Sequence, residues 1–182
     1  MERKQFLQTG LGAAALLVIR KTAVANPPAE KPFKVIAGEG RFGEFFFYKG
    51  KNPNDIKISG KDTNDQLAMF EYIGYEKTGL SLHVHFHQDE IFYVTEGNYR
   101  FVVGEETIMM SPGDTIFLPR NIPHTWIQLT DKGKLVYLVQ PAGKAEAFFR
   151  TMNNLKHVPT KEEVDKIHET CGMKVMGTQL TL

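Results

Sequence analysis

Short alternating runs of apolar and polar residues dominate the middle of the chain, from residue 35 to residue 140. Side chains of a β-strand alternate between the two faces of a sheet, so a period of two predicts strands. We expect a turn at 50–54, a polar loop at 59–65, and strands within 41–49, 55–59, 66–76, 98–103, 106–110, 115–118, 125–129 and 135–140. No helical period intervenes, which favours an all-β sandwich or barrel over βαβ units.

Helical periodicity is confined to the C-terminal part of the chain. Segment 142–153 places its large apolar residues on one stripe, and a capping box at 160–163 opens a second helix that ends at Gly172. We expect these apolar positions to pack against the barrel. His157 and His168 lie in this region, and we interpret both as surface or capping residues.

The first 25 residues resemble a signal peptide of the twin-arginine type. Arg3 and Lys4 supply a basic start, an apolar run follows, and Ala23-Val24-Ala25 matches a cleavage site. Lys4 stands where the second arginine is usual, so an ordinary secretory signal remains an alternative. We expect cleavage after Ala25 and export to the periplasm, with no lasting membrane anchor because the apolar run is too short to span a bilayer.

Length and composition indicate one globular domain after this segment. The 182 residues divide into the signal peptide 1–25, a Pro-rich linker 26–34, a β-barrel 35–141 and a helical C-terminal extension 142–182. The formal net charge of +1 shows no basic excess, so nucleic acid is not an expected partner. Cys171 is the one cysteine, which excludes an internal disulfide.

A dense cluster of metal-ligand residue types lies near the centre of the chain, between His83 and Glu90. Residues i and i+2 of a strand lie on the same face of the sheet and are roughly 6–7 Å apart, so the side chains of two such histidines can reach one metal ion. His83, His85 and His87 all share this parity, but the outer two would be about 13 Å apart on a straight strand. The bend at residues 88–89 and the spacing to Glu90 favour His83 and His85, with His87 at the pocket rim.

A further ligand must come from elsewhere in the chain. His124 lies in GDTIFLPRNIPHTW, where two prolines frame the loop that presents it. Three imidazoles and one carboxylate suit one divalent transition metal, Fe, Mn, Ni, Co, Cu or Zn, and leave positions open for substrate. The alternative is that these histidines are polar residues of a half-exposed strand.

Two segments resemble the conserved motifs of the cupin superfamily. HVHFHQDEIFYVTEG (83–97) resembles the first motif, and GDTIFLPRNIPH (113–124) the second, with Asn121 in place of the usual glycine. Gln128 stands where many cupins have asparagine. The resemblance, which extends to small single-domain cupins related to quercetin 2,3-dioxygenase, implies a double-stranded β-helix (jelly-roll) barrel. It also implies a homodimer, formed here through the N-terminal strands.

The same resemblance implies a metal held by the side chains of His83, His85, Glu90 and His124 inside the barrel mouth. Apolar residues would surround it. The candidates for the pocket wall are Phe86, Phe92, Phe101, Phe117 and Trp126. A position in the core is the favoured alternative for each of them, and Trp126, which shares the face of His124, is the best candidate for the wall.

The leading hypothesis is a metal-dependent dioxygenase that acts on a phenolic or enolisable, flavonol-like small molecule, with dioxygen as co-substrate. Glu90 would act as the general base that accepts the substrate proton. Two alternatives are a non-oxidative metal-dependent enzyme, such as an isomerase or decarboxylase, and an exported protein that binds a small ligand or metal without catalysis.

Overall fold

A computed structural model describes residue 29 and residues 31–182. The predicted signal peptide (1–25) and part of the predicted linker (26–34) lie outside these residues. Within the described part, no helix has the length and apolar character that crossing a membrane requires.

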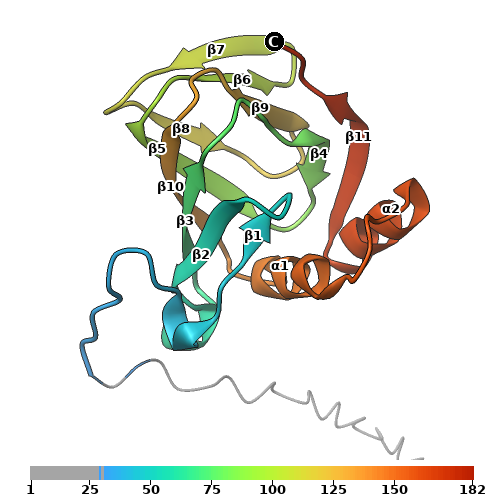
Figure 1. The fold of residues 1–182 in the computed structure, drawn as a ribbon. Coiled ribbons are helices and arrows are strands. Elements are labelled where there is room, and N and C mark those ends of the chain that lie inside the picture. The colour runs from blue at the N-terminus through green and yellow to red at the C-terminus, as the bar shows by residue number, and fades with distance from the viewer. Residues whose placement is uncertain (1–28, 30) are drawn as a thin grey trace, which may run out of the picture.

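Two antiparallel sheets form the body of the protein (Figure 1). The six-stranded sheet has the order β1 (Phe47–Tyr48), β2 (Asn52–Ile58), β3 (Ala68–Gly74), β10 (Gly133–Gln140), β5 (Asp89–Glu96), β8 (Thr115–Leu118). The five-stranded sheet has the order β11 (Met173–Gln179), β4 (Ser81–His85), β9 (His124–Gln128), β6 (Tyr99–Val103), β7 (Glu106–Met110). This arrangement confirms the predicted all-β jelly-roll fold.

The core lies between the sheets and is strongly aromatic. In β3, Ala68, Phe70 and Tyr72 are buried while their neighbours are half-buried, as the period of two predicts. Tyr137 of β10 stacks between Phe70 and Phe92, at ring-centroid distances of 5.0 and 4.9 Å. Offset aromatic stacking of this kind stabilises beyond the burial of area alone, by about 1 kcal/mol per pair.

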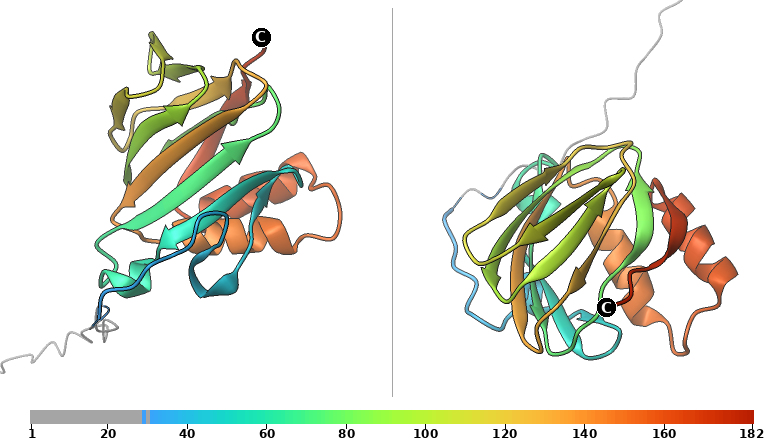
Figure 2. Two further views of the ribbon diagram at one scale, coloured as in Figure 1. Left: turned by 60° about the vertical axis from the view of Figure 1, so that its left-hand side comes forward. Right: turned by 90° about the horizontal axis from the view of Figure 1, so that it is seen from above.

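Short helices complete the chain. The 3₁₀ turn η1 (Arg41–Gly43) precedes β1, and a second one, η2 (Gly60–Asp62), lies between β2 and β3. The helices α1 (Ala145–Asn154) and α2 (Lys161–Thr170) lie between β10 and β11. The predicted capping box is present, because Thr160 and Glu163 exchange side-chain and backbone hydrogen bonds at the start of α2. Both helices lie beside the β1–β2 hairpin, at one end of the barrel (Figure 2).

The prediction that residues 142–182 are helical is incomplete. Residues Met173–Gln179 form strand β11, which pairs with β4 so that Met173 lies opposite His85 and Val175 opposite His83. The free edge of β4 supplies this pairing, and an unpaired edge strand costs hydrogen bonds. A long-range partner of this kind leaves no signal in the local pattern.

The predicted turn at 50–54 is also partly wrong, because β2 begins at Asn52. The side chain of Asn52 is buried and accepts a 2.8 Å hydrogen bond from the Tyr75 backbone N–H. Asn and Pro have turn-forming preferences, and here pairing with β1, where Phe47 lies opposite Pro53, overrides them. Of the predicted strand 41–49, only Phe47–Tyr48 is a strand.

Candidate metal centre

Four buried side chains from three strands meet near one end of the barrel interior. His83 and His85 come from β4, Glu90 from β5 and His124 from the start of β9. One ligand atom of each lies within 4.8 Å of the others. The structure therefore brings together the set that the two sequence motifs indicated, and this set could hold a metal ion.

Backbone carbonyls orient two of the imidazoles. His83 Nδ1 lies 2.9 Å from the Ser81 carbonyl oxygen, and His124 Nδ1 lies 3.0 Å from that of Ile122. A carbonyl only accepts, so each Nδ1 carries the hydrogen. In a neutral ring of this tautomer the lone pair is on Nε2, which in His124 faces the Glu90 carboxylate, and Nε2 is the atom that could bind a metal.

His85 and Glu90 complete the set. The Glu90 Oε2 atom lies 3.0 Å from His124 Nε2 and 3.7 Å from His85 Nε2. The His85 ring lies parallel to that of His124, with centroids 5.5 Å apart. Among the described residues, His85 Nδ1 is buried without a hydrogen-bond partner, and Glu90 is hydrogen-bonded only through Oε2, to His124. These two residues therefore keep donor or acceptor capacity that the fold does not use.

Burial sets the charge state of the site. Desolvation lowers the pKa of His83 to about 3, and it also lowers the pKa of His85, so both rings are neutral at pH 7. Burial alone would raise the pKa of Glu90, but interaction with the imidazoles of His85 and His124 outweighs it and holds the pKa at about 2. Neutral imidazoles and an ionised carboxylate are the protonation states that a divalent metal requires. The residues present fit such an ion.

His87 does not belong to the site or to its rim. Strand β4 ends at His85, and the chain bends at residues 86–87, so strand parity no longer applies. His87 is exposed and lies against Gly172. Gln88 turns inward instead, where it donates a 2.9 Å hydrogen bond to the Ala142 carbonyl oxygen. The placement of His87 at the pocket rim is therefore wrong.

A cavity of about 1000 Å³ opens beside the metal-ligand set. His83, His85 and Glu90 form part of its wall, and the remainder is mostly apolar and aromatic. Trp126 and Phe92 line it, as predicted, but Phe101 does not. Phe101 is fully buried behind Phe92, with ring centroids 5.4 Å apart.

Two other aromatic candidates also lie outside the cavity. The side chains of Phe86 and Phe117 are 41% and 57% exposed on the outer surface. Phe117 belongs to the outward parity of β8, in which Ile116 and Leu118 point to the core. Both of these pocket candidates are therefore wrong.

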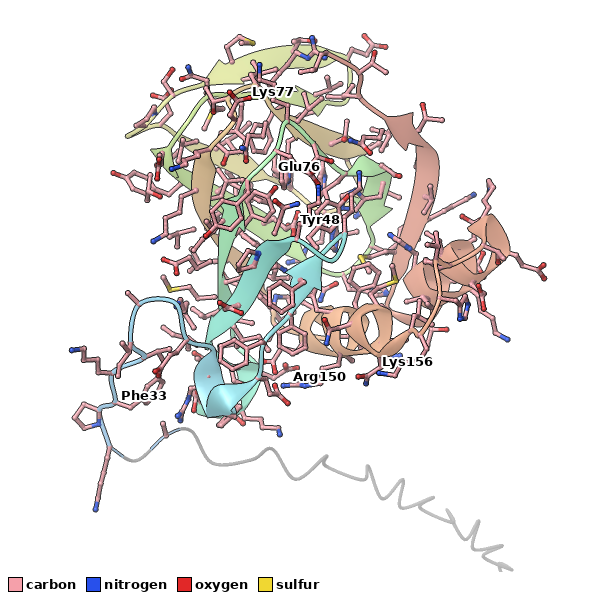
Figure 3. The ribbon with its side chains drawn as sticks, in the orientation of Figure 1. Phe33, Tyr48, Glu76, Lys77, Arg150 and Lys156 are labelled. Atoms are coloured by element: carbon pink, nitrogen blue, oxygen red, sulfur yellow. The ribbon has the colours of Figure 1, made fainter. Side chains whose placement is uncertain are left out.

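Residues from three separate parts of the chain close the cavity. The β1–β2 hairpin contributes Tyr48, and the segment between α1 and α2 contributes Lys156 (Figure 3). Helix α1 contributes Phe149. The Phe47 backbone N–H also donates a 3.3 Å hydrogen bond to Asn153 of α1, which ties the hairpin to the helix. The C-terminal helices thus line the cavity as well as pack against the barrel.

His168 of α2 is a cavity residue that the sequence interpretation missed. It is 9% exposed, and its ring lies 4.8 Å from that of Phe148 and 6.3 Å from that of His83. The expectation of a surface or capping role is therefore wrong. Val164, His168 and Cys171 recur at helical spacing and all line the cavity, so the apolar stripe of the helix carried the missed signal.

The two departures from the usual cupin pattern have structural roles. Asn121 has φ = 67°, a left-handed conformation that Asn tolerates better than most residues. Gln128 is fully buried, donates a 2.8 Å hydrogen bond to the Thr130 carbonyl oxygen and accepts one from the Tyr99 hydroxyl at 3.3 Å. Gln128 therefore provides buried structural hydrogen bonds at this position.

Comparison with known proteins agrees with this architecture. Residues 72–140 match the family model described as a Cupin domain. Over 128 residues, the chain is 27% identical to quercetin 2,3-dioxygenase of Bacillus subtilis (strain 168). The matched region covers 70% of this chain and 36% of that relative. The chain therefore spans about a third of the length of this curated relative.

Solved structures share the fold at low sequence identity. An RmlC-like cupin from Shewanella frigidimarina superposes with a TM-score of 0.53 at 18% identity, covering 64% of this chain and 96% of that one. KdgF from Halomonas sp. gives a TM-score of 0.48 at 20% identity, covering 57% of this chain and 98% of that one. The matched domain at residues 72–140 and the curated relative support a cupin superfamily protein, and the RmlC-like cupin shares its fold.

Proposed function

We propose that this cupin is a metal-dependent dioxygenase acting on an apolar, aromatic small molecule that has an enolic or phenolic oxygen. The observation that carries the proposal is that three members of the four-residue set, His83, His85 and Glu90, form part of the wall of a cavity of about 1000 Å³ whose remaining wall is mostly apolar and aromatic. The distant relative named quercetin 2,3-dioxygenase supports the same reaction class.

The protein would contribute binding, orientation and one proton transfer. A divalent ion at this site, when bound, would supply Lewis-acid and dioxygen chemistry to the substrate. His83 and His124 would hold it through ring nitrogens whose tautomers the backbone has already set. The side chains of Phe92, Trp126 and Phe149 would surround the substrate and exclude water from it.

We assign to Glu90 the role of accepting the proton of the substrate hydroxyl. Its carboxylate is ionised, and its Oε1 atom has no hydrogen-bond partner among the described residues. Oε1 would accept the hydrogen of the substrate hydroxyl while Oε2 remains beside His124. The low pKa makes Glu90 a weak base in the resting site, so proton transfer depends on the acidity of the substrate hydroxyl.

The test combines metal analysis with oxygen uptake. The protein is purified without added metal, its metal content is measured, and oxygen consumption is followed with flavonols and β-diketones as substrates. We expect about one transition-metal ion per chain and oxygen uptake in proportion to product. Product without oxygen uptake would show a non-oxidative enzyme, and tight binding without product would show a binding protein. Either outcome contradicts the proposal.

We further propose that the mature chain is exported and forms a homodimer. The basic and apolar pattern of residues 1–25 supports export. Phe42, Phe45 and Phe47 are each about half exposed near the N-terminal end of the barrel, which supports self-association there, because clustered exposed aromatic residues mark interaction surfaces. N-terminal sequencing of periplasmic protein and light scattering would test the two statements separately.

A further inference from the structure

A fourth histidine lies in the cavity that adjoins the metal-ligand set. His168 comes from α2, far along the chain from the strands that carry the other three, and its ring packs against Phe148 of α1. Its ring centroid lies 6.3 Å from that of His83, and it is not one of the four residues whose ligand atoms cluster. Its position therefore suits contact with a bound molecule and does not suit ligation of the same ion.

One side of the His168 ring is held by its own helix. Its Nδ1 lies 2.7 Å from the Val164 carbonyl oxygen, and because a carbonyl only accepts, Nδ1 carries the hydrogen. The two ring nitrogens lie on different sides of an imidazole, so Nε2 faces away from this carbonyl. Among the described residues, the His168 side chain makes only this Nδ1 hydrogen bond, and Nε2 is not one of the fully enclosed unpaired polar atoms, so it is accessible to a bound molecule.

The protonation state follows from burial. Desolvation lowers the pKa of His168 below its ordinary value, so the ring is neutral at pH 7. A neutral ring with its hydrogen on Nδ1 has a lone pair on Nε2, which makes Nε2 a hydrogen-bond acceptor. In a mostly apolar cavity, one such acceptor discriminates strongly between ligands that can pair with it and ligands that cannot.

We propose that His168 is a specificity-determining residue that accepts a hydrogen bond from a second hydroxyl group of the substrate. This inference rests on the proposed function in one respect, namely that the substrate binds the metal through a first oxygen. The inference narrows the proposed substrate class. The substrate would be an aromatic compound that has one metal-binding oxygen and a second hydroxyl group on the side of the molecule that faces α2.

The cavity supplies its own optical probe for the test. Trp126 is the single tryptophan of the chain, and it lines the cavity, so quenching of its fluorescence reports ligand binding without turnover. The probes are 3-hydroxyflavone and its derivatives that carry one added ring hydroxyl at each position in turn. We compare the dissociation constants of these probes for the metal-bearing wild-type protein, His168→Phe and His168→Gln.

Phe keeps the volume of the ring and removes both nitrogens, while Gln restores a polar group at similar reach. In either variant the backbone N–H of residue 168 can still donate its helical hydrogen bond to the Val164 carbonyl oxygen. His87→Phe is the matched control, since it removes an exposed histidine outside the cavity. Circular dichroism and metal content accompany each variant.

We expect the wild type to prefer at least one hydroxylated probe over 3-hydroxyflavone by about tenfold, the worth of one buried hydrogen bond. His168→Phe should remove this preference and leave the affinity for 3-hydroxyflavone unchanged, and His168→Gln should restore part of it. His87→Phe should keep the wild-type preference.

The inference would be overturned if the wild type showed no preference or if His168→Phe kept the wild-type preference. It would also be overturned if His168→Phe lost affinity equally for every probe, because an equal loss indicates a purely structural role. If His168→Phe does not fold, a reduced preference in a folded His168→Gln supports the inference and an unchanged preference overturns it. Binding is measured apart from oxygen uptake. A protein that shows the preference but consumes no oxygen would contradict the dioxygenase proposal and leave the role of His168 standing.

Discussion

His83 and His124 lie directly opposite each other on the neighbouring strands β4 and β9, and each donates its Nδ1–H to the carbonyl oxygen two residues before it in the chain. Their ring centroids are 4.7 Å apart. The same local hydrogen bond therefore sets the tautomer of both rings, one from each cupin motif. Because backbone atoms supply the acceptors, no side-chain substitution removes this orientation without removing the histidine itself.

Removal of one of these rings should empty the metal centre. His124→Ala deletes a buried ligand and leaves three groups, and we expect metal affinity to fall by at least ~100-fold. Metal content of the purified variant, measured by mass spectrometry, tests this. His87→Ala serves as the control and should keep the wild-type content, because His87 is exposed outside the site. A full metal complement in His124→Ala would contradict the assignment.

Glu90 should matter for turnover more than for the fold. Glu90→Gln keeps the shape of the side chain but removes its charge, and loss of a general base typically lowers kcat by about 10²–10⁴-fold. Asp89→Asn is a matched control on the same strand, since Asp89 pairs with Arg120 at the surface and does not line the cavity. Oxygen uptake per bound metal is the measurement. Equal loss in both variants would argue against a role for Glu90.

Strand β11 should support the metal centre from the edge of β4. A chain ending at Gly172 lacks β11 and exposes the edge that carries His83 and His85, so we expect a loss of about 2–4 kcal/mol in unfolding free energy together with weaker metal retention. A chain ending at Leu180 keeps the whole strand and is the control. Urea titration followed by circular dichroism compares the two, and equal stability would show that β11 is dispensable.

Gln128 should be required for stability but not for metal binding. Gln128→Leu leaves the Thr130 carbonyl oxygen and the Tyr99 hydroxyl without this buried partner, at a cost of about 1–3 kcal/mol. Gln66→Leu, at an exposed position, should change stability by less than about 0.5 kcal/mol. Denaturant midpoints and metal content are measured together. Loss of metal from a fully folded Gln128→Leu variant would be the contrary result.

The ion pair between Arg41 and Asp62 predicts a pH dependence of stability. The Arg41 guanidinium donates two hydrogen bonds to Asp62, at 2.8 and 3.0 Å, and lowers the pKa of that carboxyl group. A depressed folded-state pKa stabilises the protein above the unfolded-state pKa of about 3.9, and this stabilisation is lost as the pH falls towards the folded-state value.

Asp62→Asn should therefore be less stable than the wild type at pH 7, by on the order of 1 kcal/mol, and the difference should shrink below pH ~4. Urea unfolding at several pH values measures it. A difference that stays constant from pH 7 to pH 3 would show that the effect of Asp62 does not depend on its charge.

Local geometry explains why the fold class and the four-residue set could be predicted. Strand alternation places His83 and His85 on one face, whatever else surrounds them, and motif spacing relates them to Glu90 and His124. The Thr160–Glu163 capping box was likewise predictable because its hydrogen bonds span only one helical turn. Features of this kind depend on a few neighbouring residues.

The remaining features depend on partners that are remote in the chain. Phe92 and Phe101 have the same inward parity, yet only Phe92 reaches the cavity, because the packing between the sheets places Phe101 behind it. His168 becomes a cavity residue only because α1 and α2 fold back beside the β1–β2 hairpin. Alternation specifies the side of a strand on which a residue lies, and long-range packing decides what that residue meets there.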